Sequence, residues 1–249
     1  MSLLESNNNV TIHIFTMNSP ETNQKRLSAA QISQLKKECS ETSKNFKIKT
    51  YDVREHFDKH LINSCNNKSF YTPYAALRLL APFVLGCDKV LYLDCDIIVL
   101  KSLDFIYKRD FNDKSLLIPE FIDKRTFHNS IYLQNLKKER ENNFKEEKKA
   151  IFIYNTYVHE YPDMHAMNVA FKNYSHLYVG NLFTYNYENS FVFHISSKEV
   201  DIVNEFLTNA VFSKSAKEIR KKIVKIVQFI YKMQFKVDKN WHEMISLEK

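Results

Sequence analysis

The most constraining feature of the sequence is a short, nearly continuous apolar run, Val90–Leu93, that ends in the carboxylate pair Asp94-Cys95-Asp96. Apolar residues without alternation are typical of a strand that is covered on both faces. Two like charges at the end of such a strand repel one another and lose hydration. A hard divalent cation such as Mg²⁺ or Mn²⁺ removes both costs, because it prefers oxygen ligands. The alternative is a solvated turn after the strand.

The segment before this strand predicts a helix. Between Tyr74 and Leu85 apolar residues recur every three or four positions, and Gly86 follows where a left-handed C-cap would lie. Ligands of open α/β sheets gather at the carboxyl ends of strands. The order helix, strand, carboxylate pair therefore predicts an α/β protein with a binding site beside Asp94 and Asp96.

Two further strands and a helix precede this segment. The spans Val10–Met17 and Phe46–Val53 predict strands, and Gln24–Cys39 carries a helical apolar face. Neither face of Val10–Met17 is clearly polar, which favours a central strand. Strand, helix and strand in this order predict a mainly parallel sheet. Downstream, the mixed charges of Lys137–Lys149 predict a solvated helix.

The composition limits how a nucleotide could be held. The 249 residues suit one α/β domain with a sizeable core. Gly86 and Gly180 are the only glycines, so any phosphate must be held by a metal ion and side chains instead of a glycine-rich loop. The four cysteines lack zinc-type spacing, and free thiols favour a reducing cytoplasm. The sequence has no signal-peptide pattern and no apolar run of about 18 residues.

The basic residues are concentrated near the C-terminus. The span 214–239 contains nine Lys or Arg residues and two acidic ones. Its net charge of +7 equals the net charge of the whole chain. From Ser215 onward apolar residues follow helical spacing among cations and aromatics, which predicts a basic amphipathic tail over 213–249 on an anionic membrane surface. The alternative is a helix packed on the domain. A nucleic-acid partner is not expected, because no recognition motif accompanies the charge.

The central segment resembles glycosyltransferase family 8, whose members are retaining transferases with the GT-A fold. The matching residues are Ala76–Leu80 and Cys87–Asp96, and the part from Asp88 to Asp96 is the most specific. The resemblance extends more weakly from the N-terminus to about Lys198. It implies a GT-A domain over 1–212, a mainly parallel mixed sheet flanked by helices that binds a nucleotide-diphosphate sugar.

The resemblance also implies that the family's first strand is missing, because Ser2–Asn9 is similar to the end of the family's first helix. In the family that strand ends in acidic and polar residues that hold the nucleobase and ribose. We therefore expect an N-terminally truncated member: either the sequence begins late or the nucleotide site is incomplete.

The family pattern assigns metal and phosphate roles to several residues. Asp94, Asp96 and His194 would bind Mn²⁺ or Mg²⁺, and the backbone near Cys95 would lie along the ribose. The alternative for His194 is a packed core histidine. Lys198 would contact the diphosphate, although it comes two residues early and the usual glycine and Pro-Trp are absent.

Three further residues would contact the donor sugar. Arg78 would reach the sugar or a phosphate, Asn129 would orient a hydroxyl, and Asp163 would bond a hydroxyl as the candidate catalytic residue. The alternatives are a surface salt bridge for Arg78, a turn or cap residue for Asn129 and a helix N-cap for Asp163. Met164 and His165 replace a glutamine and an aspartate of the family. The glutamine lies near the anomeric carbon, and a thioether cannot supply its amide oxygen.

Together these features predict metal-dependent retaining transfer of a hexose from a UDP-hexose donor. The acceptor would be a saccharide or a lipid-linked saccharide, as in lipopolysaccharide or another surface glycan. The expected location is cytoplasmic, peripheral on the inner face of the cytoplasmic membrane. Two other hypotheses stay open: a truncated or degenerate member that keeps the fold without turnover, and a membrane-binding module whose function lies in the tail.

Overall fold

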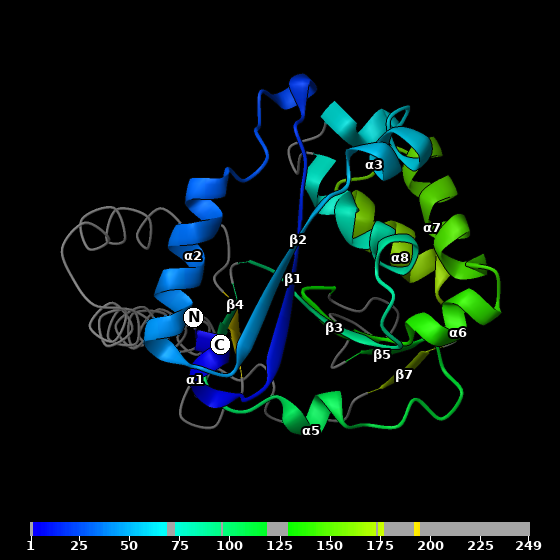
Figure 1. Ribbon diagram of the computed structural model, residues 1–249. Helices are drawn as coiled ribbons and strands as arrows, with labels where there is room; N and C mark the ends of the chain where they lie inside the picture. Colours follow the sequence, from blue (N-terminus) through cyan, green and yellow to red (C-terminus); the bar gives the residue numbers. More distant parts are fainter. Residues whose placement is uncertain are drawn as a thin grey trace, which may run out of the picture.

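The computed structural model describes residues 2–68, 73–95, 97–118, 129–172, 174–176 and 192–194. Its first unit is a pair of parallel strands, β1 (Val10–Thr16) and β2 (Phe46–Asp52), in register from Val10 opposite Phe46 to Thr16 opposite Asp52. Helix α2 (Ala29–Thr42) connects them and lies beside β2 in Figure 1. A capping box between Ser28 and Gln31 fixes the start of α2. The predicted order of strand, helix and strand is confirmed.

The second unit is a four-stranded sheet in the order β3–β6–β5–β7, beside the pair β4–β8. Within the four-stranded sheet two pairings are antiparallel and one is parallel, while β4–β8 is antiparallel and β1–β2 is parallel, so the described strands have the mixed directions expected of this α/β fold. The described strands show no ladder between β1–β2 and β3. The bounds are β3 (Val90–Leu93), β4 (Ile97–Val99), β5 (Leu116–Ile118), β6 (Ile131–Gln134), β7 (Tyr174–His176) and β8 (Val192–His194).

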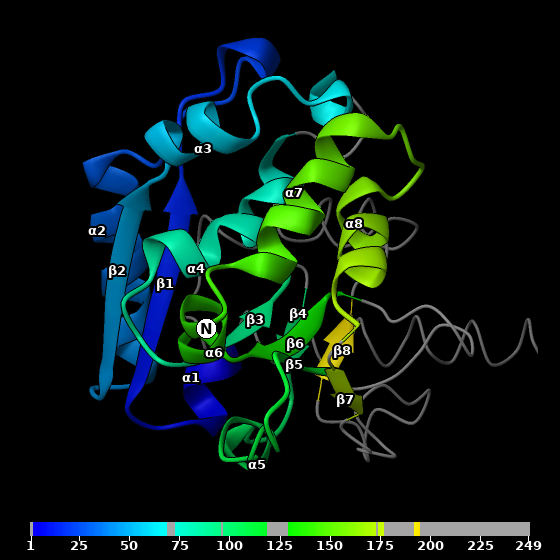
Figure 2. The same cartoon turned by 90° about the vertical axis from the view of Figure 1, so that its right-hand side faces the viewer.

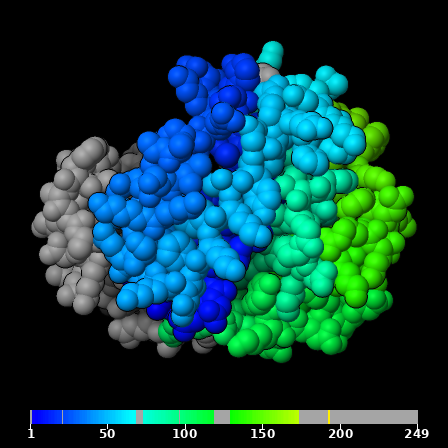
Figure 3. All heavy atoms as spheres, in the orientation of Figure 1, coloured from blue at the N-terminus to red at the C-terminus, as the bar shows by residue number. Residues whose placement is uncertain are grey.

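Helices lie above this sheet in the views of Figures 1 and 2, and β1–β2 lie beside its β3 edge. The core beneath them includes Phe57, Leu80, Tyr132, Tyr154 and Met167, all almost fully buried. In the space-filling view, α2 and β2 form the left part of the described surface and the 130–160 region the right (Figure 3). The remaining helices are α1 (Ser2–Ser6), α3 (Arg54–His60), α4 (Ala81–Val84), α5 (Asp104–Tyr107), α6 (Leu136–Glu141), α7 (Lys145–Thr156) and α8 (Pro162–Ala170), with 3₁₀ turns at Pro20–Thr22, Cys65–Lys68 and Pro73–Leu80.

The helix predicted between Tyr74 and Leu85 differs from the one observed. It is a 3₁₀ helix, Pro73–Leu80, followed by the single α-turn of α4. Pro82 explains the change, because it lacks the N–H that a continuous α-helix would need in its interior. The predicted left-handed cap at Gly86 is wrong: Gly86 does not have a positive φ, and the chain leaves α4 through an extended Leu85.

Two burial predictions also change. The residues of β3 are all partly exposed, whereas every residue of β6 is buried, so β6 is the covered strand. The solvated helix predicted over Lys137–Lys149 is two helices, α6 and α7, and two of its acids, Glu139 and Glu147, are buried. The charge pattern of the sequence does not show that an acidic residue on each of these helices faces the core.

The loop between α7 and α8 is anchored by the buried side chain of Asn66. Its amide nitrogen donates to the carbonyl oxygens of Tyr154 (2.5 Å) and Tyr157 (2.9 Å), and its oxygen accepts from the N–H of His159 (3.4 Å). This anchor sets the direction in which α8 begins, and α8 carries Asp163. The tail over 213–249 and Lys198 lie outside the described residues, and no helix in the described ranges is long and apolar enough to cross a bilayer.

Candidate active site

The site is built around the buried guanidinium of Arg78, whose side chain is only 8% exposed. Its Nη2 donates to Asp94 Oδ1 (2.8 Å), its Nη1 donates to the carbonyl oxygen of Asn129 (2.6 Å), and its Nε lies 3.2 Å from Asp163 Oδ2. A planar guanidinium offers five N–H donors in fixed directions, so one residue can hold several oxygens in a set geometry. Arg78 thereby joins three segments that are far apart in the sequence.

Two stacked tyrosines form the floor under this cluster. The Arg78 guanidinium carbon lies 4.4 Å from the centroid of the Tyr92 ring, a cation–π geometry. Tyr92 stacks on Tyr132 with ring centroids 4.9 Å apart and planes 12° from parallel. The Tyr92 hydroxyl donates to Asp94 Oδ1 (2.6 Å), so that oxygen accepts from both Arg78 and Tyr92. The tyrosines therefore support the cation and orient the carboxylate.

Strand pairing explains why these residues meet. β3 and β6 are antiparallel with Leu93 opposite Ile131, so the end of β3 lies beside the start of β6. The N–H of Asp94 donates to the carbonyl oxygen of Ser130 (2.8 Å), which continues the pairing into the turn before β6. Asp163 comes from another direction, as the second residue of α8. The site thus lies at the carboxyl end of β3, as the sequence predicted for Asp94.

Three alternatives for these residues can now be decided. Arg78 is not in a surface salt bridge, because it is buried against Asp94 and Asp163. Asp163 is not the N-cap of α8; that position is Tyr161, which makes no side-chain capping bond. Asn129 does lie in a turn, but its amide also donates to Asp163 Oδ2 (2.9 Å). Arg78, Asp94, Asn129 and Asp163, all predicted site residues, therefore form one cluster.

The ionisable groups of the cluster, among the described residues, are one guanidinium, two carboxyl groups and two phenols. Burial lowers the pKa of Arg78, but Tyr92, Asp163 and Asp94 raise it by more, so the guanidinium stays charged. Burial raises the pKa of Tyr92 and of Tyr132, so both phenols stay neutral. Among the described residues, one buried cation thus contacts two carboxyl groups. Two neighbouring carboxyl groups are a combination that a divalent cation can bind.

The other predicted metal ligands are placed only in part. Asp96 lies outside the described residues, and for His194 the structure gives the backbone. In the antiparallel pair β4–β8, His194 lies directly opposite Ile97, the residue after Asp96. Paired Cα atoms in such a ladder are about 5 Å apart. The described side chains contain no group of three potential ligands, and those of Asp96 and His194 are not among them, so the metal site stays a prediction.

The remaining predicted positions differ in what the structure shows. Cys95 is exposed directly after Asp94, and its proposed place along the ribose stays a prediction. Met164 accepts a hydrogen bond from Asn168 Nδ2 at its carbonyl oxygen (2.9 Å). The ring of His165 stacks on that of His159 with centroids 3.9 Å apart. Burial, followed by the charge of His159, lowers the pKa of His165, so a neutral ring occupies this position at pH 7.

Tyr92 and Tyr132 were not among the site residues that the sequence predicted. Tyr92 lies two residues before Asp94, and residues at this spacing on an extended chain share a face. That spacing was the available signal. Tyr132 gave none, because its place opposite Tyr92 depends on the register of β3 against β6.

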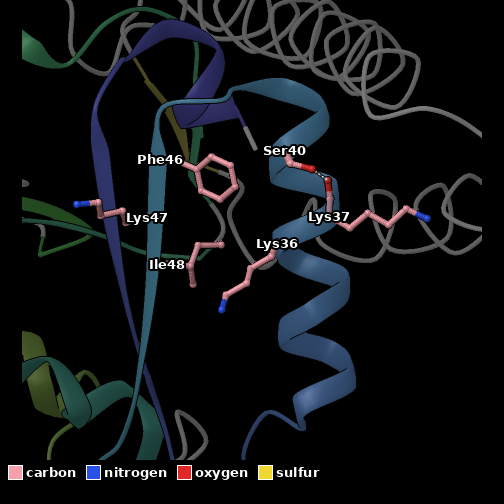
Figure 4. Close-up of a pocket in the computed structure, with 6 residues that line it drawn as sticks. All are labelled: Lys36, Lys37, Ser40, Phe46, Lys47 and Ile48. Atoms are coloured by element: carbon pink, nitrogen blue, oxygen red, sulfur yellow. Dashed lines mark hydrogen bonds between the residues drawn. The ribbon is translucent and has the colours of Figure 1, made fainter.

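A shallow surface hollow of about 610 Å³ lies apart from this cluster, between α2 and β2 (Figure 4). Phe46 and Ile48 line it from β2, and Lys36 reaches toward it from α2, whereas Lys47 points to the opposite side of the strand. None of the Arg78 cluster lines the hollow, so the candidate site does not include it.

Comparison with known families identifies the chain. Residues 1–159, more than half of it, match Glycosyl transferase family 8. The protein belongs to this family of glycosyltransferases. The family match covers Arg78, Asp94 and Asn129 and ends shortly before Asp163. No curated protein matches the chain at a significant level.

Solved structures show the same fold. The glycosyltransferase GlyE of Streptococcus pneumoniae TIGR4 is similar with a TM-score of 0.53 and 21% identity over 84% of this chain and 46% of that one. The WbbM bifunctional glycosyltransferase gives a TM-score of 0.57 and 14% identity over 87% and 52%. Mouse xyloside xylosyltransferase 1 is similar with a TM-score of 0.51 and 11% identity over 79% of this chain and 89% of that one. The chain spans about half the length of the first two, and the likeness confirms the GT-A fold.

Removal of the Arg78 charge tests the cluster. Arg78→Met keeps much of the side-chain volume but leaves Asp94 and Asp163 without their shared cation. We expect a loss of about 3 kcal/mol in the free energy of unfolding at pH 7, because buried carboxylates then lack a partner. Urea unfolding monitored by circular dichroism measures this loss.

The matched control is Arg26→Met, which breaks the exposed pair with Asp52 (3.0 Å). We expect this change to cost no more than about 0.5 kcal/mol. Equal losses in the two variants would contradict a structural role of the buried ion pair.

Proposed function

We propose that the protein transfers a hexose from a UDP-hexose donor to a saccharide acceptor with retained anomeric configuration, assisted by a divalent metal ion. The observation that carries the proposal is the Arg78 cluster, which gathers two carboxylates and an amide at the carboxyl end of β3 in a member of a glycosyltransferase family. Open α/β folds bind ligands at such strand ends.

The residues present suit a Mn²⁺ or Mg²⁺ ion held by Asp94, Asp96 and His194. Two carboxylates and an imidazole are ligands that Mn²⁺ accepts, and carboxylates suit Mg²⁺. The position of the Asp94 carboxylate at the end of β3 and the pairing of His194 with Ile97 support this assignment. A metal ion bound there supplies positive charge that stabilises the departing diphosphate.

Asp163 is the residue best arranged to act on the donor sugar. Its Oδ2 is held by both Asn129 Nδ2 and Arg78 Nε, so the carboxylate has a fixed orientation. A fixed carboxylate can accept hydrogen bonds from sugar hydroxyls and stabilise positive charge that develops on the ring. Asn129 and Arg78 would position it and contact donor oxygens, while Cys95 and Lys198 would contact ribose and diphosphate.

We propose same-face attack for the transfer step, because Met164 offers no amide oxygen near the reacting carbon. The bond between the anomeric carbon and the UDP oxygen breaks. The acceptor oxygen bonds to that carbon from the same face, and its proton passes to the leaving phosphate. This route needs no covalent intermediate with the protein.

Met164 also supports a second candidate function, a family member that binds donor without turnover. Phosphate and metal contacts would persist, while the step at the anomeric carbon would be lost. Binding and turnover measurements separate the two functions.

A binding experiment tests the metal and donor assignments. We expect UDP to bind the protein in calorimetry only with Mn²⁺ or Mg²⁺ present, and Asp94→Asn to weaken binding by about 100-fold through loss of a ligand charge. The asparagine oxygen can still accept from Arg78 and Tyr92, which should keep the fold. Asp104→Asn, at an exposed pair with Lys108, is the control and should bind like the wild type. Equal UDP affinity in the wild type and Asp94→Asn would contradict the assignment.

A turnover experiment tests Asp163. We expect Asp163→Asn to lower kcat by 100- to 1,000-fold, roughly the effect of removing one preorganised electrostatic group, with little change in UDP affinity. NMR of the product should show the anomeric configuration of the donor. An inverted product would exclude same-face attack, and full UDP binding without turnover in the wild type would favour the non-catalytic alternative.

We further propose that the protein lies on the inner face of the cytoplasmic membrane, where a lipid-linked acceptor would be present. The basic, aromatic composition of 213–249 supports this location. We expect the full chain to sediment with vesicles that contain anionic lipid and to dissociate at high salt. A chain that lacks residues 215–249 should stay in the supernatant. Equal sedimentation of both chains would exclude the tail as the membrane contact.

A further inference from the structure

Two buried carboxyl groups lie beside β6, outside the Arg78 cluster. Glu139 on α6 and Glu147 on α7 are 0% and 1% exposed. The buried amide of Gln134, the last residue of β6, donates from Nε2 to Glu147 Oε1 (2.5 Å). The Glu139 carboxyl lies near Glu147 and the hydroxyl of Ser115, which precedes β5. Among the described residues, both oxygens of Glu139 and Oε2 of Glu147 are buried without a hydrogen-bond partner. The two acids therefore meet where α6 and α7 cover the sheet.

No cation neutralises this pair within the described part of the chain. Of the basic residues on these helices, Lys138 contacts Asp113, Arg140 contacts Asp88 and Lys148 contacts Asn143. The others are exposed: Lys137, which lies near Glu141, Lys145 and Lys149. The other ionisable groups that face the pair are Glu146 on α7 and Tyr132 on β6, and neither brings a positive charge. Among the described residues, the pair thus consists of two buried acids without a cation beside them.

Two ionised carboxylates cannot stay stably in such a place. Each would lose its hydration, and at close range they would repel one another. A single shared proton relieves both costs, because the neutral carboxyl then donates a hydrogen bond to its ionised partner. Burial raises the pKa of both acids, and for Glu147 the hydrogen bond and charge of Glu139 raise it further.

We infer that Glu139 and Glu147 hold a shared proton at neutral pH and act as positioning residues, which fix α6 and α7 on β6 and so fix the floor of the active site. Gln134 and Tyr132 are two residues apart on β6 and share a face. Tyr132 stacks on Tyr92, which supports Arg78 and bonds Asp94. Displacement of β6 by ionisation of the pair would therefore move the stacked tyrosines.

The inference gives a definite sign of pH dependence. The folded pKa of the pair is raised, so between the ordinary glutamate value of 4.5 and the folded value the native state retains a proton that the unfolded chain has lost. Raising the pH through this window favours unfolding. The unfolding equilibrium constant should rise by up to about tenfold per pH unit for the one proton.

Unfolding in urea from pH 5 to 8.5 tests this directly. The variant Glu139→Gln together with Glu147→Gln keeps the shape of both side chains and removes the titrating pair. In this double variant we expect the unfolding equilibrium constant to increase less steeply with pH than in the wild type. The difference should be up to about tenfold per pH unit. The control is Glu141→Gln, an exposed acid on α6, which should keep the wild-type slope. Parallel curves for the wild type and the double variant would overturn the inference.

Infrared spectroscopy of the wild type provides an independent test that needs no folded variant. We expect the band of a protonated carboxyl at pH 7 and throughout the range in which the unfolding constant rises, with loss of that band at the higher pH where the rise ends. If the variant Glu139→Gln together with Glu147→Gln folds, the band should be absent from it. The absence of the band from the wild type at pH 7 would overturn the inference.

The link to the active site rests on the proposed function, and it has its own measurement. UDP affinity measured with Mn²⁺ should fall in the wild type as the pair loses its proton and should change less in the double variant. The same pH profile in both would show that the pair does not position the site. If the wild type does not bind UDP at all, the proposed function fails, while the unfolding and infrared results still decide the shared proton.

Discussion

The structure depends above all on one buried cation. The guanidinium of Arg78 is held by groups from the end of β3, the turn before β6 and the first turn of α8. A buried charge of this kind is tolerated only when its donors are used and its countercharges are close. The segments that supply those groups must therefore keep their mutual positions, and this requirement links the fold to the candidate site.

A second layer supports the first. β6 is buried along its whole length, and one of its faces carries Tyr132 toward the Arg78 cluster and Gln134 toward the buried acids. A strand with little freedom can transmit a small displacement from one end to the other, because packed interiors deform little. Glu139 and Glu147 are therefore linked to the site through β6, although they do not contact the Arg78 cluster.

The sequence predicted the parts of the site that depend on local order, and it failed where the answer depends on pairing. Arg78, Asp94, Asn129 and Asp163 could be assigned because each lies in a motif that resembles the family, and the structure brings these four together. Burial of Glu139 and Glu147 could not be predicted, since a segment rich in both charges looks solvated until the strand beneath it is known. The stacking of Tyr92 on Tyr132 likewise requires the β3–β6 register.

A glycosyltransferase has to bind a diphosphate and to act on the anomeric carbon of the sugar, and in this fold different residues would serve these two tasks. Binding a diphosphate requires fixed charges, and the Asp94 carboxylate, held in place by Arg78 and Tyr92, is suited to a metal ion that would meet this demand. Acting on the anomeric carbon requires polar groups near the sugar. There Asp163 is held in place, while Met164 and His165 replace two polar residues of the family pattern. Donor affinity should therefore depend mainly on the end of β3, and turnover mainly on Asp163.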